Sequence, residues 1–545
     1  MVEAPSFRMI CVAVITSIAG SFHFGFNLVL TNPSQEAFLN FMNQTLAKRF
    51  DGGLSDNTLQ NIWSFVVAIL FLGALAGSFS IRLIADWIGR KNGLYISIAV
   101  GVLAGGMSIA SKFIPLFELY IASRIVMGWS VSVSLGLSAL FLSEASPKQN
   151  RGAIGMMTGT CVQLGTVCGS VIAMPQIFGT EDLWWLIYAT EIGIMLFFGA
   201  ALPFFPESPG FLIQRGATEA ATKSIAYYYN CEIDEAEKHL NEIKEEQKNS
   251  TKNFKMMDIV RKKSLRDKAF IGVVVTFAMS FSGVAVINAF AFDILKDTGL
   301  KVLEASLAND AISVVSMISS IVAAVIVDRN GRRPLLLISF AGILVCNLII
   351  FALMFTFYKF EWCFYVAKIF LIFLGLKIAI TLHKKLVSIF QNHVLGFILI
   401  CFICIFTFFF ALGPGPLCYF INAELVGQAA RSAAQSWASV IQMLSRFVIV
   451  TAFLPMKNQL GEAWSYLILF VAPVAASLVY LYFSLPETKN KNPFEVEEAI
   501  EDLPKFPLCG KNRVYDRKQS QEMVLSRQMQ LVVDYGSIES LSYRL

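Results

Sequence analysis

The chain has 545 residues, of which 56% are hydrophobic and only 15% carry a charged side chain, and its mean hydropathy is +0.61. This balance excludes an ordinary soluble globular protein and indicates a membrane protein. The formal net charge is only +5, and we expect no nucleic-acid partner.

Twelve apolar stretches are each long enough to cross the hydrocarbon core of a bilayer as a helix, which takes about 20 residues. They lie at residues 9–30, 62–85, 93–111, 117–142, 153–177, 183–204, 269–292, 305–327, 334–357, 395–423, 433–455 and 464–484. Isolated strands leave backbone groups unsatisfied in lipid, and the spans show no barrel-type alternation of polar and apolar residues. We therefore expect every span to be an α-helix.

One charged hexapeptide occurs twice, as Asp86-Trp-Ile-Gly-Arg-Lys91 and as Asp328-Arg-Asn-Gly-Arg-Arg333, at an offset of 242 residues (328 − 86). Each copy follows the second span of a set of six. The repeat predicts an all-α membrane protein with twelve transmembrane helices in two pseudo-symmetric six-helix bundles, at residues 1–204 and 269–488. Two bodies that rock about a central site are what alternating access requires, so the repeat indicates a transporter.

Two polar segments lie outside these bundles. Residues 205–268 are highly charged, but apolar side chains such as Ile225, Tyr229 and Leu240 recur there at helical spacing. We expect a linker with short amphipathic helices, the alternative being a solvated linker with transient helix. Residues 489–545 form a polar tail, which we expect to be loose beyond Asp502.

Clusters of Lys and Arg follow the even-numbered spans, for example at Arg90, Arg151 and Arg332. The positive-inside rule therefore places these loops, the linker and both termini in the cytoplasm. The sequon Asn43-Gln-Thr45 then lies in the first external loop, which makes Asn43 a candidate glycosylation site. We expect a multi-pass protein of the plasma membrane.

The spans and loops contain no motif for catalysis: no nucleotide-binding loop, no cluster of metal ligands and no nucleophile beside a base. Seven of the ten cysteines lie inside apolar spans, including the pair Cys401-x-x-Cys404, and a thiol there usually packs as a small hydrophobic group. We expect no enzymatic activity, no cofactor and no metal site.

Short motifs occur in order along nearly the whole chain. They are Phe24-Gly-Phe-Asn27, Trp63-Ser64, Gly77-Ser-Phe-Ser80, Arg124 with Gly128, Glu144-Ala-Ser-Pro147, Arg151-Gly152, Gln163-Leu-Gly165, Pro206-Glu-Ser-Pro209, Ser282-Gly283, Gly331-Arg-Arg333, Gly413-Pro-Gly-Pro416, Ala423-Glu-Leu425 with Arg431, and Pro486-Glu-Thr-Lys489. Each motif is weak alone, but the ordered set resembles the sugar-porter branch of the major facilitator superfamily. Within that branch it resembles the animal facilitative hexose (glucose and fructose) transporters.

The resemblance implies a uniporter of a hexose or a related small polar solute that works by alternating access. Proton-linked members of the branch carry an aspartate where this chain has Asn27, and an amide cannot cycle a proton, which favours passive transport. The alternatives are a solute sensor that kept the fold without transport, or a carrier of a non-sugar solute. We expect the solute and the lipid bilayer to be the partners.

Charged residues recur at the predicted cytoplasmic ends of both bundles. Glu144 and Arg151 are seven residues apart, about 10 Å of helix rise, so each should pair with a neighbouring helix, and the same holds for Glu424 and Arg431. Such pairs would hold the halves together on the inside and break on inward opening; alternatively, these charges only anchor helix ends. With the resemblance, the predicted network comprises Asp86, Arg90, Lys91, Arg124, Glu144, Arg151, Glu207, Asp328, Arg332, Arg333, Glu424 and Arg431.

The predicted solute site lies at the midplane between the halves. A hexose needs amide side chains that both donate and accept, with aromatic surface for the ring face. The candidate contacts are Gln163, Asn27, Ser280, Asn288, Tyr419 and Gln442. The glutamine pair of the resembled family is replaced by Met279 and Ser280, and its tryptophan by Tyr419, so a hexose, a polyol and another small polar solute remain open. Arg446 introduces a charge into the eleventh span, where it needs an aqueous or ionic partner.

Residues Cys363 to Gln391 form an extra segment where hexose transporters have a short external link. The segment is apolar up to Leu382 but contains Lys368 and Lys377. If it crossed the membrane, every later loop would change sides, and Glu424 and Arg431 would face outside while their counterparts Glu144 and Arg151 stay inside. Because this would break the symmetry of the repeat, we predict that the segment does not span the membrane. It is either an external or interfacial hairpin or a retained intron in the gene sequence, and sequencing the transcript distinguishes the two.

Overall fold

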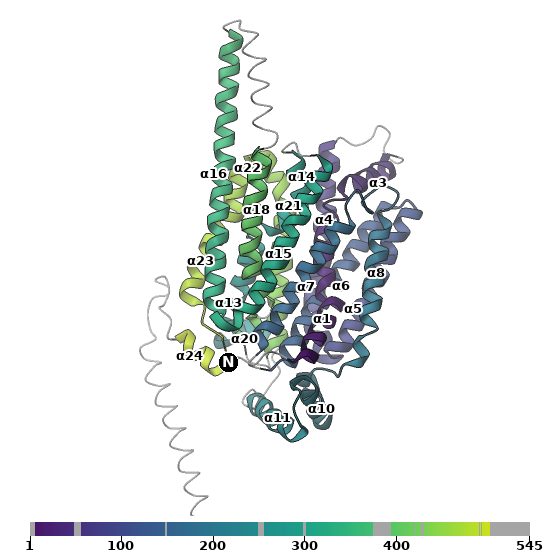
Figure 1. The fold of residues 1–545 in the computed structure, drawn as a ribbon, viewed down its shortest axis with the longest axis vertical. Coiled ribbons are helices and arrows are strands. Elements are labelled where there is room, and N and C mark those ends of the chain that lie inside the picture. Colours follow the sequence, from purple (N-terminus) through teal and green to yellow (C-terminus); the bar gives the residue numbers. More distant parts are fainter. Residues whose placement is uncertain are drawn as a thin grey trace, which may run out of the picture. The chain divides into compact units, whose positions relative to one another are not determined.

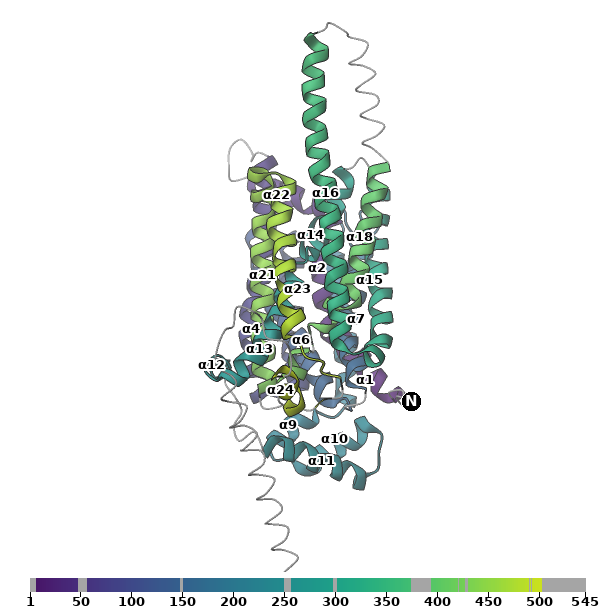
Figure 2. The ribbon, with the colours of Figure 1, turned by 90° about the vertical axis from the view of Figure 1, so that its left-hand side faces the viewer.

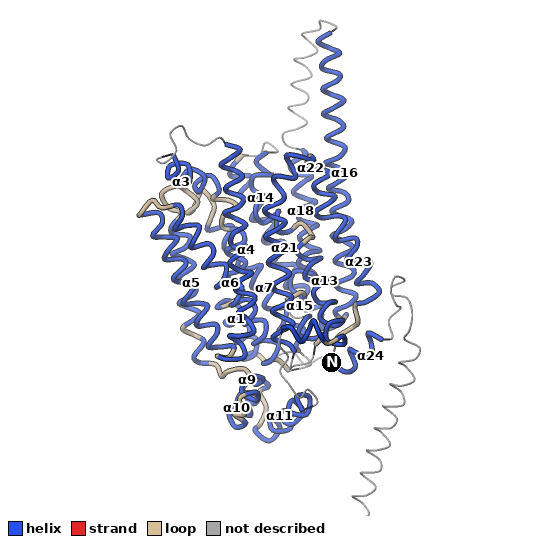
Figure 3. Tube along the Cα trace, turned by 180° about the vertical axis from the view of Figure 1, so that it is seen from behind, coloured by secondary structure: helices blue, strands red, loops and turns tan. Residues whose placement is uncertain are grey.

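The predicted spans correspond to helices in a computed structural model (Figure 1). Along the chain, the helices of the N-terminal half come first and those of the C-terminal half follow. The structure describes residues 6–501 except 48–55, 148–149, 249–255, 298–300, 374–393, 420, 427–429, 490 and 492. These residues belong to a compact unit, Met1–Asp502. The expected loose tail lies outside the described residues. Within the described ranges every regular element is a helix, as Figure 3 shows by colour.

The N-terminal half comprises a bent first span and five longer helices. Its helices are α1 (Phe7–Ala19), α2 (Ser21–Val29), the short α3 (Gln35–Ala47), α4 (Asp56–Trp87), α5 (Arg90–Phe113), α6 (Phe117–Ala145), α7 (Arg151–Ile172) and α8 (Trp185–Gly199), followed by the 3-10 turn η1 (Leu202–Phe204). The helices α1 and α2 meet at Gly20 with a bend of 43° and together form the first span.

The C-terminal half repeats this order with more interruptions. Its helices are α13 (Lys263–Ser280), α14 (Val284–Asp297), α15 (Val302–Asn330), α16 (Arg332–Phe373), α18 (Val394–Leu412), α19 (Pro414–Leu417), α20 (Ile421–Leu425), α21 (Arg431–Leu460), α22 (Glu462–Tyr466), the π-helical η3 (Leu467–Val471), α23 (Ala472–Ser484) and α24 (Pro493–Glu501). Proline and glycine interrupt the tenth span at Gly413-Pro-Gly-Pro416, where each ring removes a backbone donor.

Ten described helices are long and apolar enough to cross a membrane, and eleven do so if the bent first pair is one span. The predicted seventh span corresponds to α13 and α14, which are separated by a break at residues 281–283 where Gly283 has a φ of 108°. With this broken span the arrangement matches the expected twelve-helix membrane fold.

The interval predicted as a linker forms α9 (Pro209–Gln214), α10 (Thr218–Tyr229), α11 (Ile233–Lys248) and α12 (Met256–Arg261). Ala221 and Ile225 of α10 pack against Ala236 and Leu240 of α11 in a small core of their own. In Figures 1 and 2 these two helices extend beyond one end of the bundle, which we call the linker end; α3 lies at the opposite end.

Small residues let helices within a half approach closely. A Cβ added at Gly25 of α2 would overlap the Val162 carbonyl of α7, and one at Gly165 would overlap the Phe22 carbonyl in return. Between the halves, α4 packs along α21 and α7 along α15. The two halves thus meet along these helix pairs.

The helix α16 continues well past the predicted end of its span at residue 357. It has 42 residues, about 63 Å of helix rise, and projects beyond the α3 end of the bundle (Figure 1). After Gly342 the next glycine is Gly375, and no proline intervenes, so nothing in the sequence ends the helix earlier. The first part of the extra segment, Cys363–Phe373, therefore extends α16; residues 374–391 lie outside the described residues.

Candidate functional site

A group of buried and half-buried polar residues, the N-half cluster, lies at the linker end and comprises Arg90, Lys91, Glu144, Glu207 and Ser208. Arg90 donates from Nε and Nη2 to Glu144 Oε1 over 3.2 and 2.8 Å, and Ser208 Oγ donates to Glu144 Oε2 over 2.7 Å. A buried pair is stable only when its remaining donors and acceptors are satisfied. Arg90 Nη1 meets this condition by donating to the carbonyl of Ala85.

Glu207 completes this cluster through the backbone. The amide N–H of Lys91 donates to both carboxylate oxygens of Glu207 over 3.1 Å, and Lys91 Nζ donates to the carbonyl of Phe205. Burial raises the pKa of Glu207, while the N–H groups of Ser208 and Lys91 and the charge of Arg90 act in the opposite direction. Gly89 leads into this contact with a φ of 103°, a conformation that favours glycine.

The C-half cluster, Arg332, Arg333, Glu424, Glu487 and Thr488, repeats the main contacts of this arrangement. Arg332 donates from Nε and Nη2 to the two oxygens of Glu424 over 3.2 and 3.1 Å, and Thr488 Oγ1 donates to Glu424 Oε2 over 2.6 Å. The amides of Arg332 and Arg333 donate to Glu487. Gly331 has a φ of 91°, as Gly89 does in the first half. The repeat seen in the sequence is therefore a repeat of geometry.

Both Arg–Glu pairs join residues of the same half, which differs from the expectation that these pairs hold the halves together. One hydrogen bond that does cross between the halves in this region runs from Ser432 Oγ of α21 to Asp86 Oδ1 of α4, over 3.1 Å. Arg82 also pairs with Asp86 from one turn earlier in α4. Arg431 is buried at the first residue of α21, and the side chains of Arg151 and Asp328 lie outside the described residues.

Arg124 does not belong to these clusters, which corrects the sequence-based assignment. It lies 20 residues before Glu144 on α6, about 30 Å along the helix, because the motif that suggested it sits near the opposite end of that span. Its Nη1 donates to Asn27 Oδ1 over 3.3 Å, and Asn27 Nδ2 in turn donates to Glu191 of α8. Asn27 is thus part of a buried polar network inside the N-terminal half, not a free contact for solute.

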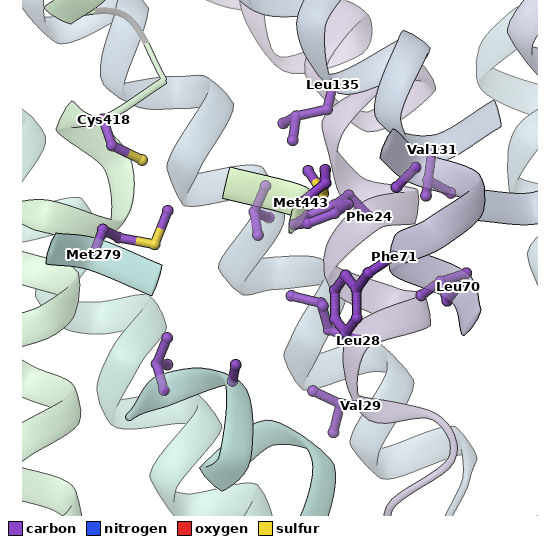
Figure 4. Packing of buried hydrophobic residues seen from close by; sticks show 14 of the residues in the cluster. Phe24, Leu28, Val29, Leu70, Phe71, Val131, Leu135, Met279, Cys418 and Met443 are labelled. Carbon is purple, nitrogen blue, oxygen red and sulfur yellow. The ribbon is translucent and has the colours of Figure 1, made fainter. Parts of the chain in front are cut away.

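A different group of polar side chains gathers where the halves meet. The hydroxyl of Tyr419 lies beside Gln442 and Arg446 of α21. The guanidinium of Arg446 lies 5.1 Å from the centroid of the Phe24 ring of α2, and its Nη2 is 3.6 Å from Met279 Sδ of α13. Phe24 and Met279 belong to one buried hydrophobic cluster that also includes Cys418 and Met443 (Figure 4). Two of the predicted contacts, Tyr419 and Gln442, are therefore brought together here.

The positions of the other predicted contacts do not link them to this group. Gln163 is buried in α7, where its Oε1 accepts from Thr166 Oγ1 over 3.4 Å. Ser280 donates to the carbonyl of Thr276 in its own helix, and Asn288 is half-buried in α14. Asn43 is exposed on α3, while Thr45 of its sequon donates to carbonyl oxygens of that helix.

The structure adds functional candidates that the sequence-based selection missed. Glu487 is the counterpart of Glu207, and the signal was present, since Pro486-Glu-Thr follows Pro206-Glu-Ser at an offset of 280 residues (487 − 207), the same offset that separates Glu424 from Glu144. Glu191 had no such signal. No group of three His, Cys, Asp or Glu side chains suited to a metal ion occurs among the residues that the structure describes.

The sequence profile of the family described as "Sugar (and other) transporter" matches residues 12–374 and 357–500, two segments that overlap at residues 357–374, partly within the extra segment. The "Solute carrier family 2, facilitated glucose transporter member 3" of Ovis aries is 29% identical over 90% of the chain and 92% of the relative, and its Homo sapiens counterpart is 28% identical over 90% and 92%. The fold is similar to that of the proton:xylose symporter XylE bound to 6-bromo-6-deoxy-D-glucose, with a TM-score of 0.72 at 19% identity, covering 91% of this chain and 100% of the other.

Proposed function

Since this chain belongs to the sugar (and other) transporter family, we propose that it is a passive carrier, a uniporter of a hexose or a closely related small polar solute. It is a multi-pass membrane protein and a sugar transporter that works by alternating access. The matching family and relatives are transporters, so the sensor alternative is not favoured.

One observation carries this proposal, the presence of matching charged clusters at the linker end of both halves. Each cluster ties the start of one helix to the end of another and to the segment that follows the last span of the half. Such ties let each half move as a rigid body, which is the motion that alternating access needs. The Asp86–Ser432 hydrogen bond then helps to close the linker end between the halves.

The proposal of passive transport rests on Asn27. Its amide bridges Arg124 and Glu191, where a carboxylate in its place would bind and release a proton. An amide does not titrate, so no proton is exchanged at this position during the cycle.

The proposed orientation places the linker end and both termini in the cytoplasm, consistent with the basic residues there. Asn43, an exposed residue of α3 at the opposite end, is then external and open to glycosylation, and the plasma membrane is the proposed location.

Uptake of radiolabelled glucose, fructose, xylose and sorbitol into liposomes containing the purified protein tests the proposal. We expect saturable uptake of at least one of these solutes that stops at equal concentrations on both sides and does not respond to an imposed pH gradient. Accumulation above the external concentration under a proton gradient would show active transport instead. Empty liposomes and a Glu144→Gln variant, in which the N-half cluster is broken, serve as controls.

A further inference from the structure

Arg446 is a buried cation in the middle of the eleventh span. It lies fifteen residues from the first residue of α21 and fourteen from the last, about 22 Å from either end, and only 2% of its surface is exposed. A charge at this depth is rare in membrane proteins and marks a functional site by default, because it is costly to hold away from water.

Among the residues that the structure describes, no acidic side chain pairs with Arg446. Its neighbours are the Phe24 ring, the thioether of Met279 and the hydroxyl of Tyr419. By contrast, Arg90 and Arg332, which are equally buried, each face a glutamate. Within the described part of the chain, Nε and Nη1 of Arg446 have no hydrogen-bond partner.

Gln442 adds a further donor at the same place. It lies one helical turn before Arg446 on α21, hence on the same face, and its Nε2 also has no acceptor among the described residues. All three orphaned groups, Nε and Nη1 of Arg446 and Nε2 of Gln442, are donors. They therefore call for a ligand that is rich in acceptors.

The position of Arg446 and Gln442 between the two halves indicates that the ligand is the transported solute. Phe24 belongs to the N-terminal half, and Met279, Tyr419 and Gln442 belong to the C-terminal half, so Arg446 lies where the two halves meet. A neutral sugar would satisfy the donors but leave the guanidinium charge uncompensated. A carboxylate does both, because its two oxygens match the planar fork of an arginine.

We infer that the central site binds a sugar acid, a monosaccharide-sized solute whose carboxylate pairs with Arg446 and Gln442. The inference rests on the proposed transport function and names the class of its substrate. A uniporter that moves a monoanion also moves one net charge per cycle, so its flux depends on the membrane potential, whereas the flux of a neutral hexose does not.

The test measures uptake of labelled glucuronate and labelled glucose into liposomes with an imposed potassium diffusion potential. We expect saturable glucuronate uptake that is faster when the interior is positive. Unlabelled glucuronate should compete at least tenfold better than glucuronamide, which has the same shape without the charge.

Three variants assign the effect to the guanidinium. Arg446→Gln should lower glucuronate uptake at least 100-fold and leave glucose uptake equal or higher, which also shows that the variant folds. Arg446→Lys, which keeps the charge and loses the fork, should lower glucuronate uptake about tenfold. The control Arg266→Gln removes an exposed arginine at the start of α13 and should change neither flux.

The outcomes separate the two proposals. Saturable glucose uptake without glucuronate uptake, or glucuronate uptake that Arg446→Gln leaves intact, overturns the sugar-acid inference while the transport function stands. No saturable uptake of any sugar or sugar acid overturns both.

Discussion

The clusters at the linker end and the polar group at the midplane differ in how completely their hydrogen bonds are satisfied. In the two clusters the arginine donors face named acceptors, and the arginine–glutamate and hydroxyl–glutamate contacts of one half have counterparts in the other. At the midplane, Arg446 and Gln442 come from one half only and keep unpartnered donors among the described residues. Polar groups that occur in both halves and have all their hydrogen bonds satisfied indicate a structural role. Polar groups that occur in one half and lack hydrogen-bond partners indicate a ligand-binding site.

Breaking one buried ion pair should have the largest effect on stability. The substitution Glu144→Leu leaves the buried charge of Arg90 without its partner. It should lower the free energy of unfolding by about 3–5 kcal/mol, measured by thermal unfolding of the purified protein. Glu424→Leu should cost about as much, since its pair with Arg332 is the counterpart. The double variant Arg90→Met/Glu144→Leu should recover most of the loss; a double variant as unstable as the single one would show that the pair is not the cause.

Glycine substitutions beside the clusters should have the next largest effect. Gly89→Ala and Gly331→Ala place a side chain at a positive φ and against the carboxylates of Glu207 and Glu487, and each should cost about 1–3 kcal/mol of stability. Gly106→Ala on α5 is the matched control, because an added Cβ there meets nothing within 4 Å. Equal stability of Gly89→Ala and Gly106→Ala in thermal unfolding would argue against this geometry.

The hydroxyls of the two clusters provide a finer comparison. Ser208→Ala and Thr488→Val each remove one hydrogen bond to a buried glutamate, and each should cost about 1–2 kcal/mol. Ser208 also caps α9 by accepting from the Phe211 amide, so its loss should cost about 1 kcal/mol more than that of Thr488. The reverse order in denaturation of the two purified variants would contradict the assignment of the cap.

The contact between the halves should give the smallest effect. Ser432→Ala removes the hydrogen bond to Asp86 and should shift the balance between inward-open and inward-closed forms by about 1 kcal/mol. Labelling of a cysteine introduced at Ser436, a buried residue one helical turn after Ser432 on α21, measures that balance, and faster labelling in the Ser432→Ala background is expected. Unchanged labelling would mean that Ser432 does not help to close this end.

Long apolar runs and the hexapeptide repeat predict the spans closely, because a long apolar run can satisfy its backbone hydrogen bonds in lipid only as an α-helix. The sequence does not show in the same way which charged residues pair with each other. The spacing of Glu144 and Arg151 shows that they need neighbours, but it does not say whether those neighbours belong to the same half. Arg124 was grouped by motif when its depth in α6 already separated it from Glu144.

The midplane was harder to predict because a helical pattern does not tell which buried side chains remain unpaired. Asn27 fits a sugar site by composition, yet its partners come from α6 and α8 of the same half. Arg446 is visible in the sequence as an unusual charge, but only the structure shows that Phe24 and Met279 lie beside it.

The confinement of each arginine–glutamate pair to its own half has a consequence for the rate of transport. We expect the two described pairs, Arg90–Glu144 and Arg332–Glu424, to stay intact as the halves rock and so to add nothing to the activation barrier of the conformational step. Salt should therefore change turnover little through these two pairs, even though the protein relies on their buried charges to hold its shape.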